Sequence, residues 1–313
     1  MTPEERESIR DVIKGSAATL LLFLAYAAVP LIGTPAGIIA PFPALFYFLK
    51  QGRTSGLAIV LVTVAVLALA EPTIAVLYLF QAGILSLLLA EFLRRGYGGA
   101  RSIAGSVAAV AVLVVVTATV YGLWSGVNLV DLIRKGVAVS INQTAALYQK
   151  GGFSPEELSV IQEALKQSGA LIGMVYPALL ILVMVAIAGM SLSLVIRNAG
   201  RLRQQPVIGR FSSYRNPDHL IWPVILSGFC LLLDHPVLFQ VSLNILIVTL
   251  GLYFTQGLAI IVAFFDRYTV SSLMRGIFYV LLAVQPYLAI GVTLFGLFDL
   301  WLNFRTPKTG ENL

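Results

Sequence analysis

The sequence predicts an all-α protein, a polytopic bundle of about nine transmembrane helices, and two observations support this prediction. The 313 residues are 58% hydrophobic and only 12% charged, with a mean hydropathy of +0.89. Roughly a quarter of the residues in a soluble domain carry a charge. The charged residues here also gather in short runs between apolar segments, as in loops between membrane spans. Residues 1–313 are therefore expected to form a single membrane domain, with the lipid bilayer as a partner.

Apolar segments divide the chain into its expected spans, because a helix needs about 20 apolar residues to cross a bilayer and shorter runs cross when they tilt. The spans are expected near residues 16–33, 35–50, 55–71, 73–93, 103–124, 169–196, 219–233, 236–265 and 273–302. The second and the seventh segments are the shortest. The count falls to eight if the segment at 219–233 enters the membrane without crossing it.

Basic residues follow alternate spans, which orients the chain by the positive-inside rule. These residues are Lys50, Arg53, Arg94, Arg95, Arg101, Arg197, Arg201, Arg203, Arg210, Arg215, Arg267 and Arg275. The sequence therefore predicts a cytoplasmic amino-terminal segment at 1–15 and a basic cytoplasmic loop at 197–218. Nine spans would place the tail after Arg305 outside, and eight spans would place it inside.

A polar segment at residues 125–168 separates the fifth and sixth spans and contains two helix signals. Asn128 is expected to cap a first helix. The apolar stripe of this helix is formed by Val130, Ile133, Val137 and Ile141. Ser154 and Pro155, followed by two glutamates, are typical of the start of a second helix. The segment is expected to form an amphipathic helical hairpin, either as a lid or as a structural connector.

Two short motifs also predict an internal repeat, a common feature of membrane transporters. Leu77-Tyr78-x-x-Gln81 recurs as Leu252-Tyr253-x-x-Gln256, and in both places an acidic residue follows ten residues later. If these motifs are equivalent, residues 35–124 and 169–302 form two parallel halves, and the first span is additional.

The sequence lacks the motifs that catalysis and metal binding usually require. It contains no GxxxxGK[ST], no GxGxxG after a strand, no CxxC and no HExxH. His219 and His235 each follow an aspartate, but a helix would hold them roughly 24 Å apart, so one ion could not bind both. We therefore expect no enzyme activity, no cofactor and no metal ion. Basic residues lie mostly at span ends, where anionic lipid accounts for them, and nucleic acid is not an expected partner.

Polar residues within apolar spans are costly in lipid and usually face a bundle interior or a cavity. Gln240, Asn244 and Thr255 share one face of the eighth span, which is expected to be buried. Such a face forms either interhelical hydrogen bonds or the lining of a substrate site. The candidates for ligand lining are Gln81, Gln240, Asn244, Thr255 and Gln256.

Full charges are expected only at the ends of spans, and no carboxylate is expected in the middle of the membrane. Glu91 and Asp266 have arginines close by in the sequence, so local pairing accounts for them. Asp299, Trp301 and Arg305 form a candidate interfacial cluster near the carboxy terminus.

Three sequence segments resemble a known family. Residues 296–305 read GLFDLWLNFR, similar to the closing G-x-x-D-x-W-x-D-F-R pattern of the bacterial YybS-like family, the domain of unknown function 2232. Residues 211–217 (FSSYRNP) and 253–259 (YFTQGLA) are also similar to that family. Asn303 stands where the pattern has an acid. The resemblance implies a multi-pass protein of the bacterial cytoplasmic (inner) membrane with no established activity.

A more distant likeness is to the substrate-binding membrane subunits of energy-coupling-factor transporters. It rests on the proline-rich apolar run at residues 30–43 and on the segment KQGRTSGL at residues 50–57, which opens the next span. Those subunits usually have about six spans, fewer than the sequence predicts here.

The polar face, the proline and glycine interruptions and the repeat favour a membrane protein that binds or transports a small molecule between its helices. The alternative is a non-transporting scaffold that docks envelope, division or biogenesis proteins through the basic loop and the amphipathic hairpin. The expected protein partner is a coupling protein in the first case and an envelope protein in the second.

Overall fold

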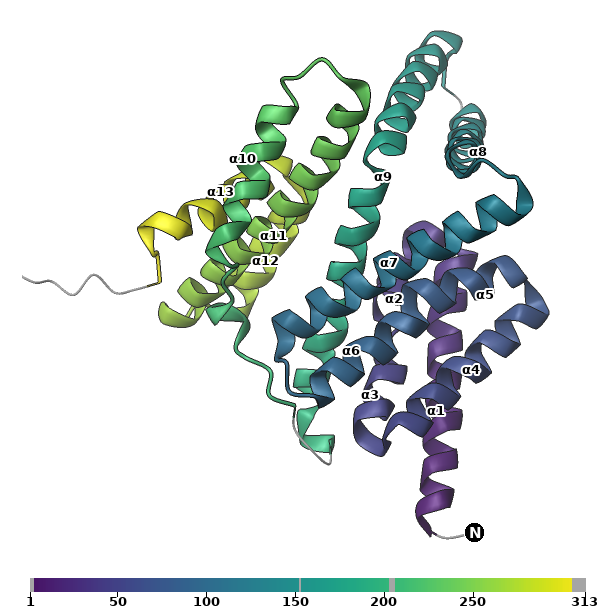
Figure 1. Ribbon diagram of the computed structural model, residues 1–313, viewed down its shortest axis with the longest axis vertical. Coiled ribbons are helices and arrows are strands. Elements are labelled where there is room, and N and C mark those ends of the chain that lie inside the picture. Colours follow the sequence, from purple (N-terminus) through teal and green to yellow (C-terminus); the bar gives the residue numbers. More distant parts are fainter. Residues whose placement is uncertain (1–2, 152, 203–205, 306–313) are drawn as a thin grey trace, which may run out of the picture. The chain divides into compact units, whose positions relative to one another are not determined.

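A computed structural model describes residues 3–151, 153–202 and 206–305 (Figure 1). These residues form helices joined by turns, with no strand among them, so the all-α prediction is confirmed. The chain divides into two compact units. Unit 1 comprises Met1–Gly126 and Ile181–Ile208, and unit 2 comprises Val127–Leu180 and Gly209–Leu313.

The predicted count of about nine spans is not confirmed. Within the described residues, six helices are long and apolar enough to cross a membrane, and a strongly bent helix pair would make a seventh. The six are Glu5–Ala28, Arg53–Ala70, Pro72–Arg94, Gly99–Ser125, Glu156–Arg197 and Pro236–Arg267. The predicted second, seventh and ninth spans are not among these six helices.

Proline divides the predicted second span into two short helices. α2 (Pro30–Ile39) and α3 (Phe42–Gln51) meet at Ala40 and Pro41. Pro41 has no N–H to continue the hydrogen bonding of the first helix, although Ala40 and Pro41 both keep helical backbone angles. Each helix has ten residues, roughly 15 Å, about half of a bilayer core.

The predicted seventh and ninth spans are also shorter elements. Only α10 (Ile221–Cys230) forms within 219–233, and it follows a non-helical segment with two 3₁₀ turns. The predicted ninth span is two helices, α12 (Ser272–Val284) and α13 (Pro286–Leu302), bent by 107°. Gln285 has extended backbone angles, and Pro286 cannot donate the hydrogen bond that would continue α12.

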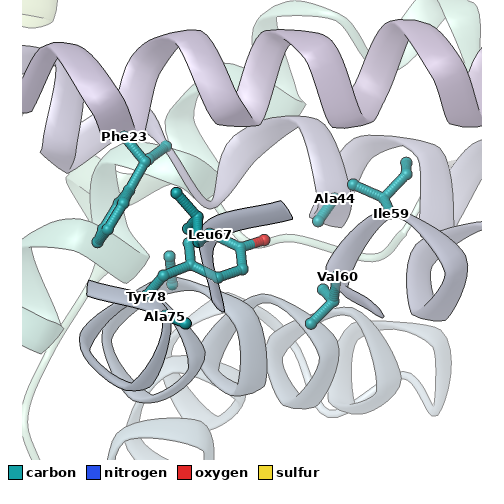
Figure 2. Close-up of a cluster of buried hydrophobic side chains, with 9 residues drawn as sticks. Phe23, Ala44, Ile59, Val60, Leu67, Ala75 and Tyr78 are labelled. Atoms are coloured by element: carbon teal, nitrogen blue, oxygen red, sulfur yellow. The ribbon is translucent and has the colours of Figure 1, made fainter. Parts of the chain in front are cut away.

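Unit 1 is built around an apolar core. Besides α2 and α3, this unit contains α1 (Pro3–Ala28), α4 (Arg53–Ala70), α5 (Pro72–Tyr78), the π-helical turn η1 (Leu79–Gly83), α6 (Ile84–Arg94) and α7 (Gly99–Ser125). Figure 2 shows the core, where Phe23 of α1 meets Leu67 of α4 and Tyr78 of α5. The rings of Phe23 and Tyr78 pack edge to face with their centres 5.1 Å apart.

Charged residues meet at one end of unit 1. Lys50 Nζ lies 2.6 Å from Asp11 Oδ2, and Arg53 Nε donates to Glu91 Oε2 at 2.9 Å. Gly52, with φ of +110°, makes the sharp connection between α3 and α4 that this pairing requires. The amino-terminal segment and the first two basic loops, which the sequence predicts on one side of the membrane, are therefore paired with one another.

Unit 2 contains α8 (Leu129–Lys150) and the start of α9 (Pro155–Arg197), together with α10, α11 (Pro236–Arg267), α12 and α13. The predicted helix start at Ser154 is confirmed, because Ser154 and Glu157 exchange the hydrogen bonds of a capping box. The predicted second helix of the hairpin is continuous with the sixth span, and both belong to α9.

α8 begins directly after Asn128 and packs against α9. A side chain at Gly169 of α9 would overlap Ile141 and contact Val137. The side chains of Val130 and Ile133, which the sequence places in the same apolar stripe, lie outside the described residues.

α11 and α13 approach each other so closely that their backbones touch. A Cβ atom at Gly257 would overlap the carbonyl oxygen of Val292, and one at Gly296 would overlap that of Tyr253. Small residues of this kind allow membrane helices to pack backbone against backbone.

We predict that Gly257→Ala and Gly296→Ala each lower the free energy of unfolding by about 1–3 kcal/mol, because the added methyl group must push α11 and α13 apart. Thermal unfolding in detergent measures the change. The matched controls are Gly276→Ala and Gly291→Ala, where a Cβ atom has no neighbour within 4 Å. These controls should be neutral or stabilising, and equal losses at all four positions would contradict the prediction.

Candidate functional site

The candidate site in unit 2 is centred on a buried carboxylate. Asp299, near the end of α13, is 1% exposed. Its Oδ2 accepts a hydrogen bond from Gln256 Nε2 at 2.9 Å, and its Oδ1 accepts one from the backbone N–H of Phe304 at 3.1 Å. Arg305 Nη2 lies 3.5 Å from the same Oδ2. A charge removed from solvent requires such partners, and this carboxylate has three.

Gln256 connects Asp299 to the non-helical segment before α10. Its Oε1 accepts the backbone N–H of Asn216 at 2.9 Å, and Asn216 Nδ2 donates to the carbonyl of Leu252 at 2.9 Å. The Tyr214 hydroxyl donates to Asn216 Oδ1 at 2.6 Å. Burial raises the pKa of Tyr214, so the phenol stays protonated as a donor. Non-helical backbone inside a bundle needs such partners for its polar groups.

Asp299 lies three residues before the end of α13, in keeping with a charge at a span end, but its partner on α11 lies far from the end of that helix. Gln256, its partner, precedes Asp266 by ten residues, which is roughly 15 Å along α11. Asp299 is close to the end of α13 in sequence, but α13 packs against the interior of α11. The position of Asp299 along α11 is therefore set by how α13 packs against α11, and not by how close Asp299 is to the end of α13.

Asn303 turns the chain back toward Asp299 after α13 ends. It has a left-handed backbone with φ of +47° and ψ of +58°, a conformation that asparagine adopts more readily than most residues. The turn lets the N–H of Phe304 and the guanidinium of Arg305 reach the carboxylate. This gives a structural reason for asparagine at a position where the family pattern has an acid.

A pocket of about 540 Å³ adjoins Asp299 and Arg305, and we call it the unit 2 pocket. It is lined by Arg210, Ser212, Ser213, Arg215, Ala263, Asp266, Asp299, Asn303 and Arg305. Arg305 Nη1 donates to the carbonyl of Ser212 at 3.0 Å and so joins the end of α13 to the basic loop. Burial lowers the pKa of Arg305, Asp299 opposes this effect, and the nearby charge of Arg215 lowers the pKa further.

Asn244, a predicted ligand-lining residue, is engaged with the backbone of α9. Its Oδ1 accepts the N–H of Ala178 at 2.9 Å, and its Nδ2 donates to the carbonyl of Met174 at 2.8 Å. Pro177 has no N–H to bond to the carbonyl of Gly173, so the backbone hydrogen bonding of α9 is interrupted next to this pair of residues. The Asn244 amide thus supports the backbone of α9 at its internal proline.

The other predicted residues lie in different environments. Thr255 Oγ1 donates to the carbonyl of Gly251 in its own helix at 3.0 Å, and Gln240 is exposed. Gln81 lies in the π-helical turn η1 of unit 1. Of the five candidates, Gln256 is the one that contacts the cluster around Asp299. That these five residues line a ligand site stays a prediction.

Within the candidate interfacial cluster, the structure pairs Asp299 with Arg305, whereas the Trp301 ring is 62% exposed and packs against Phe298. Asn216, Ser212 and Ser213 also belong to this site, although they are not among the residues predicted to form it. The segment 211–217, which resembles the known family, was the signal that could have indicated them. Among the residues with assigned positions, no group of three His, Cys, Asp or Glu side chains could hold a metal ion.

The fold and the site define a polytopic α-helical membrane protein with a polar pocket beside a buried carboxylate. The chain belongs to the family described as predicted membrane protein (DUF2232), whose family model matches residues 17–300. No curated protein and no solved structure matches the chain. The likeness to energy-coupling-factor subunits is therefore not confirmed.

The three segments that resemble the family meet at this site. Segment 211–217 contributes Asn216, segment 253–259 contributes Gln256, and segment 296–305 contributes Asp299 and Arg305. The same segments contain the glycines at which α11 and α13 touch.

We predict that Asp299→Asn lowers the free energy of unfolding by about 1–3 kcal/mol, because it leaves a partly buried guanidinium without its carboxylate. A double-mutant cycle with Arg305→Gln measures the coupling by thermal unfolding. The double variant should lose less stability than the sum of the single variants. Additive losses would show that Asp299 and Arg305 are not coupled.

We also predict that Asn244→Leu destabilises the protein by about 1–2 kcal/mol, since it removes the partners of Ala178 N–H and Met174 C=O. Replacing Pro177 by alanine in the same chain should recover part of this loss, because a regular helix can then form. Thr255→Val is the control on the same helix. An equal loss in Thr255→Val, or no recovery, would contradict this role for Asn244.

Proposed function

We propose that this protein binds and transports a small molecule through a site between the helices of unit 2. The unit 2 pocket, with its buried carboxylate, is the observation that carries the proposal. Its volume of about 540 Å³ falls within the roughly 300–1,000 Å³ typical of small-molecule sites. Eight of the nine residues that line it are polar or charged, in a chain that is 58% hydrophobic.

Interrupted helices around the pocket support this proposal. α10 has ten residues, so its length of roughly 15 Å is about half of a bilayer core. In the non-helical segment before α10, Asn216 forms hydrogen bonds with the Gln256 side chain and the Leu252 carbonyl of α11. The axes of α12 and α13 are bent by 107°. Transporters commonly form substrate sites from such discontinuous helices, because the interruption frees backbone groups to face a cavity.

We assign no chemical step to this pocket. Both oxygens of Asp299 accept hydrogen bonds, and Asp266 Oδ1 lies 2.9 Å from Arg275 Nη1. A carboxylate held in this way suits positioning better than proton transfer, because protonation would break its ion pair. The proposed role is therefore binding and movement of a ligand without its conversion.

We propose that the protein lies in the bacterial inner membrane with its amino terminus in the cytoplasm. The positive-inside rule supports this orientation, since basic residues gather at the ends of helices. In unit 1, Asp11 and Glu91 pair with Lys50 and Arg53, which links the amino-terminal segment and two basic loops. In unit 2, the contact of Arg305 with Ser212 supports the eight-span prediction, in which the tail and the basic loop share one side.

We predict that Ala263→Leu abolishes ligand binding by filling part of the unit 2 pocket, which Ala263 lines. The tagged protein is purified in mild detergent from its native membranes, and small molecules and proteins in one eluate are identified by mass spectrometry. A stoichiometric metabolite should accompany the wild type but not Ala263→Leu. Ala283→Leu, at an exposed position on α12, is the matched control and should retain it.

Two outcomes would contradict the proposed function. The first is retention of the metabolite by Ala263→Leu at the wild-type level. The second is recovery of envelope or division proteins without any metabolite, which would favour the scaffold alternative. Recovery of an ATPase with a coupling membrane subunit would support transport.

A further inference from the structure

We infer that the unit 2 pocket binds a phosphate-bearing anion, held by the guanidinium groups of Arg210 and Arg215. This inference rests on the proposed function, because it assigns a ligand class to the same pocket. Two observations support it: the net charge of the residues that line the pocket and the hydrogen-bond donors that these residues present.

The pocket wall has more positive than negative charge available to a ligand. Three arginines and two aspartates line it. Asp299 is buried and accepts hydrogen bonds at both oxygens. Asp299 is paired with Arg305, which itself lines the pocket, and Asp266 is paired with Arg275, which does not. The positive charges that remain for a ligand are those of Arg210 and Arg215, and they favour an anion.

Arginines of the pocket wall also retain donors that no described group binds at a short distance. Arg305 Nε is buried and has no hydrogen-bond acceptor within the described part of the chain. Among the described residues, the side-chain contacts of Arg215 are long, at 3.4 Å to Asp218 and 3.4 Å to Asn303. Arg210 is exposed and forms no ion pair among the described residues. Because Arg305 Nε is buried, the donors that a ligand in the pocket can reach are those of Arg210 and Arg215.

Phosphate matches this set of donors better than a single carboxylate does. A guanidinium group presents a planar fork of N–H donors that pairs with two oxygens of a phosphate. Two such groups offer more donors than the two oxygens of one carboxylate accept, whereas a phosphate has three terminal oxygens and up to two charges. The hydroxyl groups of Ser212 and Ser213 line the same pocket and add neutral donors.

Two kinds of ligand supply such a phosphate group, a soluble phosphorylated compound and the headgroup of an anionic phospholipid. The protein is reconstituted in phosphatidylcholine nanodiscs, and inorganic pyrophosphate is titrated by calorimetry to test the soluble source. In a second arm, phosphatidic acid is included in the bilayer, and lipid retention is measured by native mass spectrometry. Binding in the first arm identifies a soluble ligand, and retention in the second arm alone identifies a lipid.

The test variants are Arg210→Gln and the double variant Arg210→Gln with Arg215→Gln. Each lost guanidinium contact should weaken binding about tenfold, the usual effect of removing one hydrogen bond to a charged group. Arg267→Gln is the matched control, because it removes one positive charge next to Asp266 but does not line the pocket. Unchanged thermal unfolding of the variants shows that they are folded.

Absence of binding in both arms would overturn the inference, and so would equal weakening by Arg267→Gln, which would indicate only general surface charge. A metabolite that copurifies with the wild type, is lost in Ala263→Leu and carries no phosphate would overturn the ligand class while the proposed function stands. Retention of a phosphorylated metabolite by Ala263→Leu would overturn both.

Discussion

The backbone contact between α11 and α13 is the constraint on which the rest of unit 2 depends. Gly257 follows Gln256 directly, and Gly296 precedes Asp299 by less than one helical turn. Because neither glycine has a side chain, the two helices come close enough for the Gln256 amide to donate to the Asp299 carboxylate. A wider separation would leave that carboxylate buried without one of its partners. Close packing is therefore the condition under which a charge can be buried here.

The buried charge in turn organises two segments that have no regular helix of their own. The chain after Leu302 returns through the left-handed Asn303 to offer Phe304 N–H and Arg305, and Arg305 binds the carbonyl of Ser212. The amide of Gln256 holds the segment before α10 from the other side. Buried polar groups of this kind often add little net stability, because desolvation offsets their attraction. Their effect here is to position the arginines and serines that line the pocket.

The two units combine different kinds of packing. Unit 1 has an apolar core around Phe23 and Tyr78, and its charges pair with one another at one end. Unit 2 has interrupted helices, an amide of Asn244 that supports α9 at Pro177, and a pocket with arginine donors for which the described residues supply no acceptor. Interrupted backbone and unpaired donors are costly in a bundle and are retained where a ligand uses them. This contrast is why we place the proposed binding site in unit 2.

The sequence alone determined that the protein is an α-helical membrane protein of the DUF2232 family, and it located the start of α9 at the capping box of Ser154. Composition, hydropathy and local motifs are sufficient for these conclusions, because each depends on residues close together in the chain. The tertiary structure decided that Pro41 and Pro286 interrupt predicted spans, and that Asn216, Gln256 and Asp299 meet. These partners are 40 and 43 residues apart. Helical periodicity identifies the residues that share a face of one helix, but the partner of that face depends on how the helices pack.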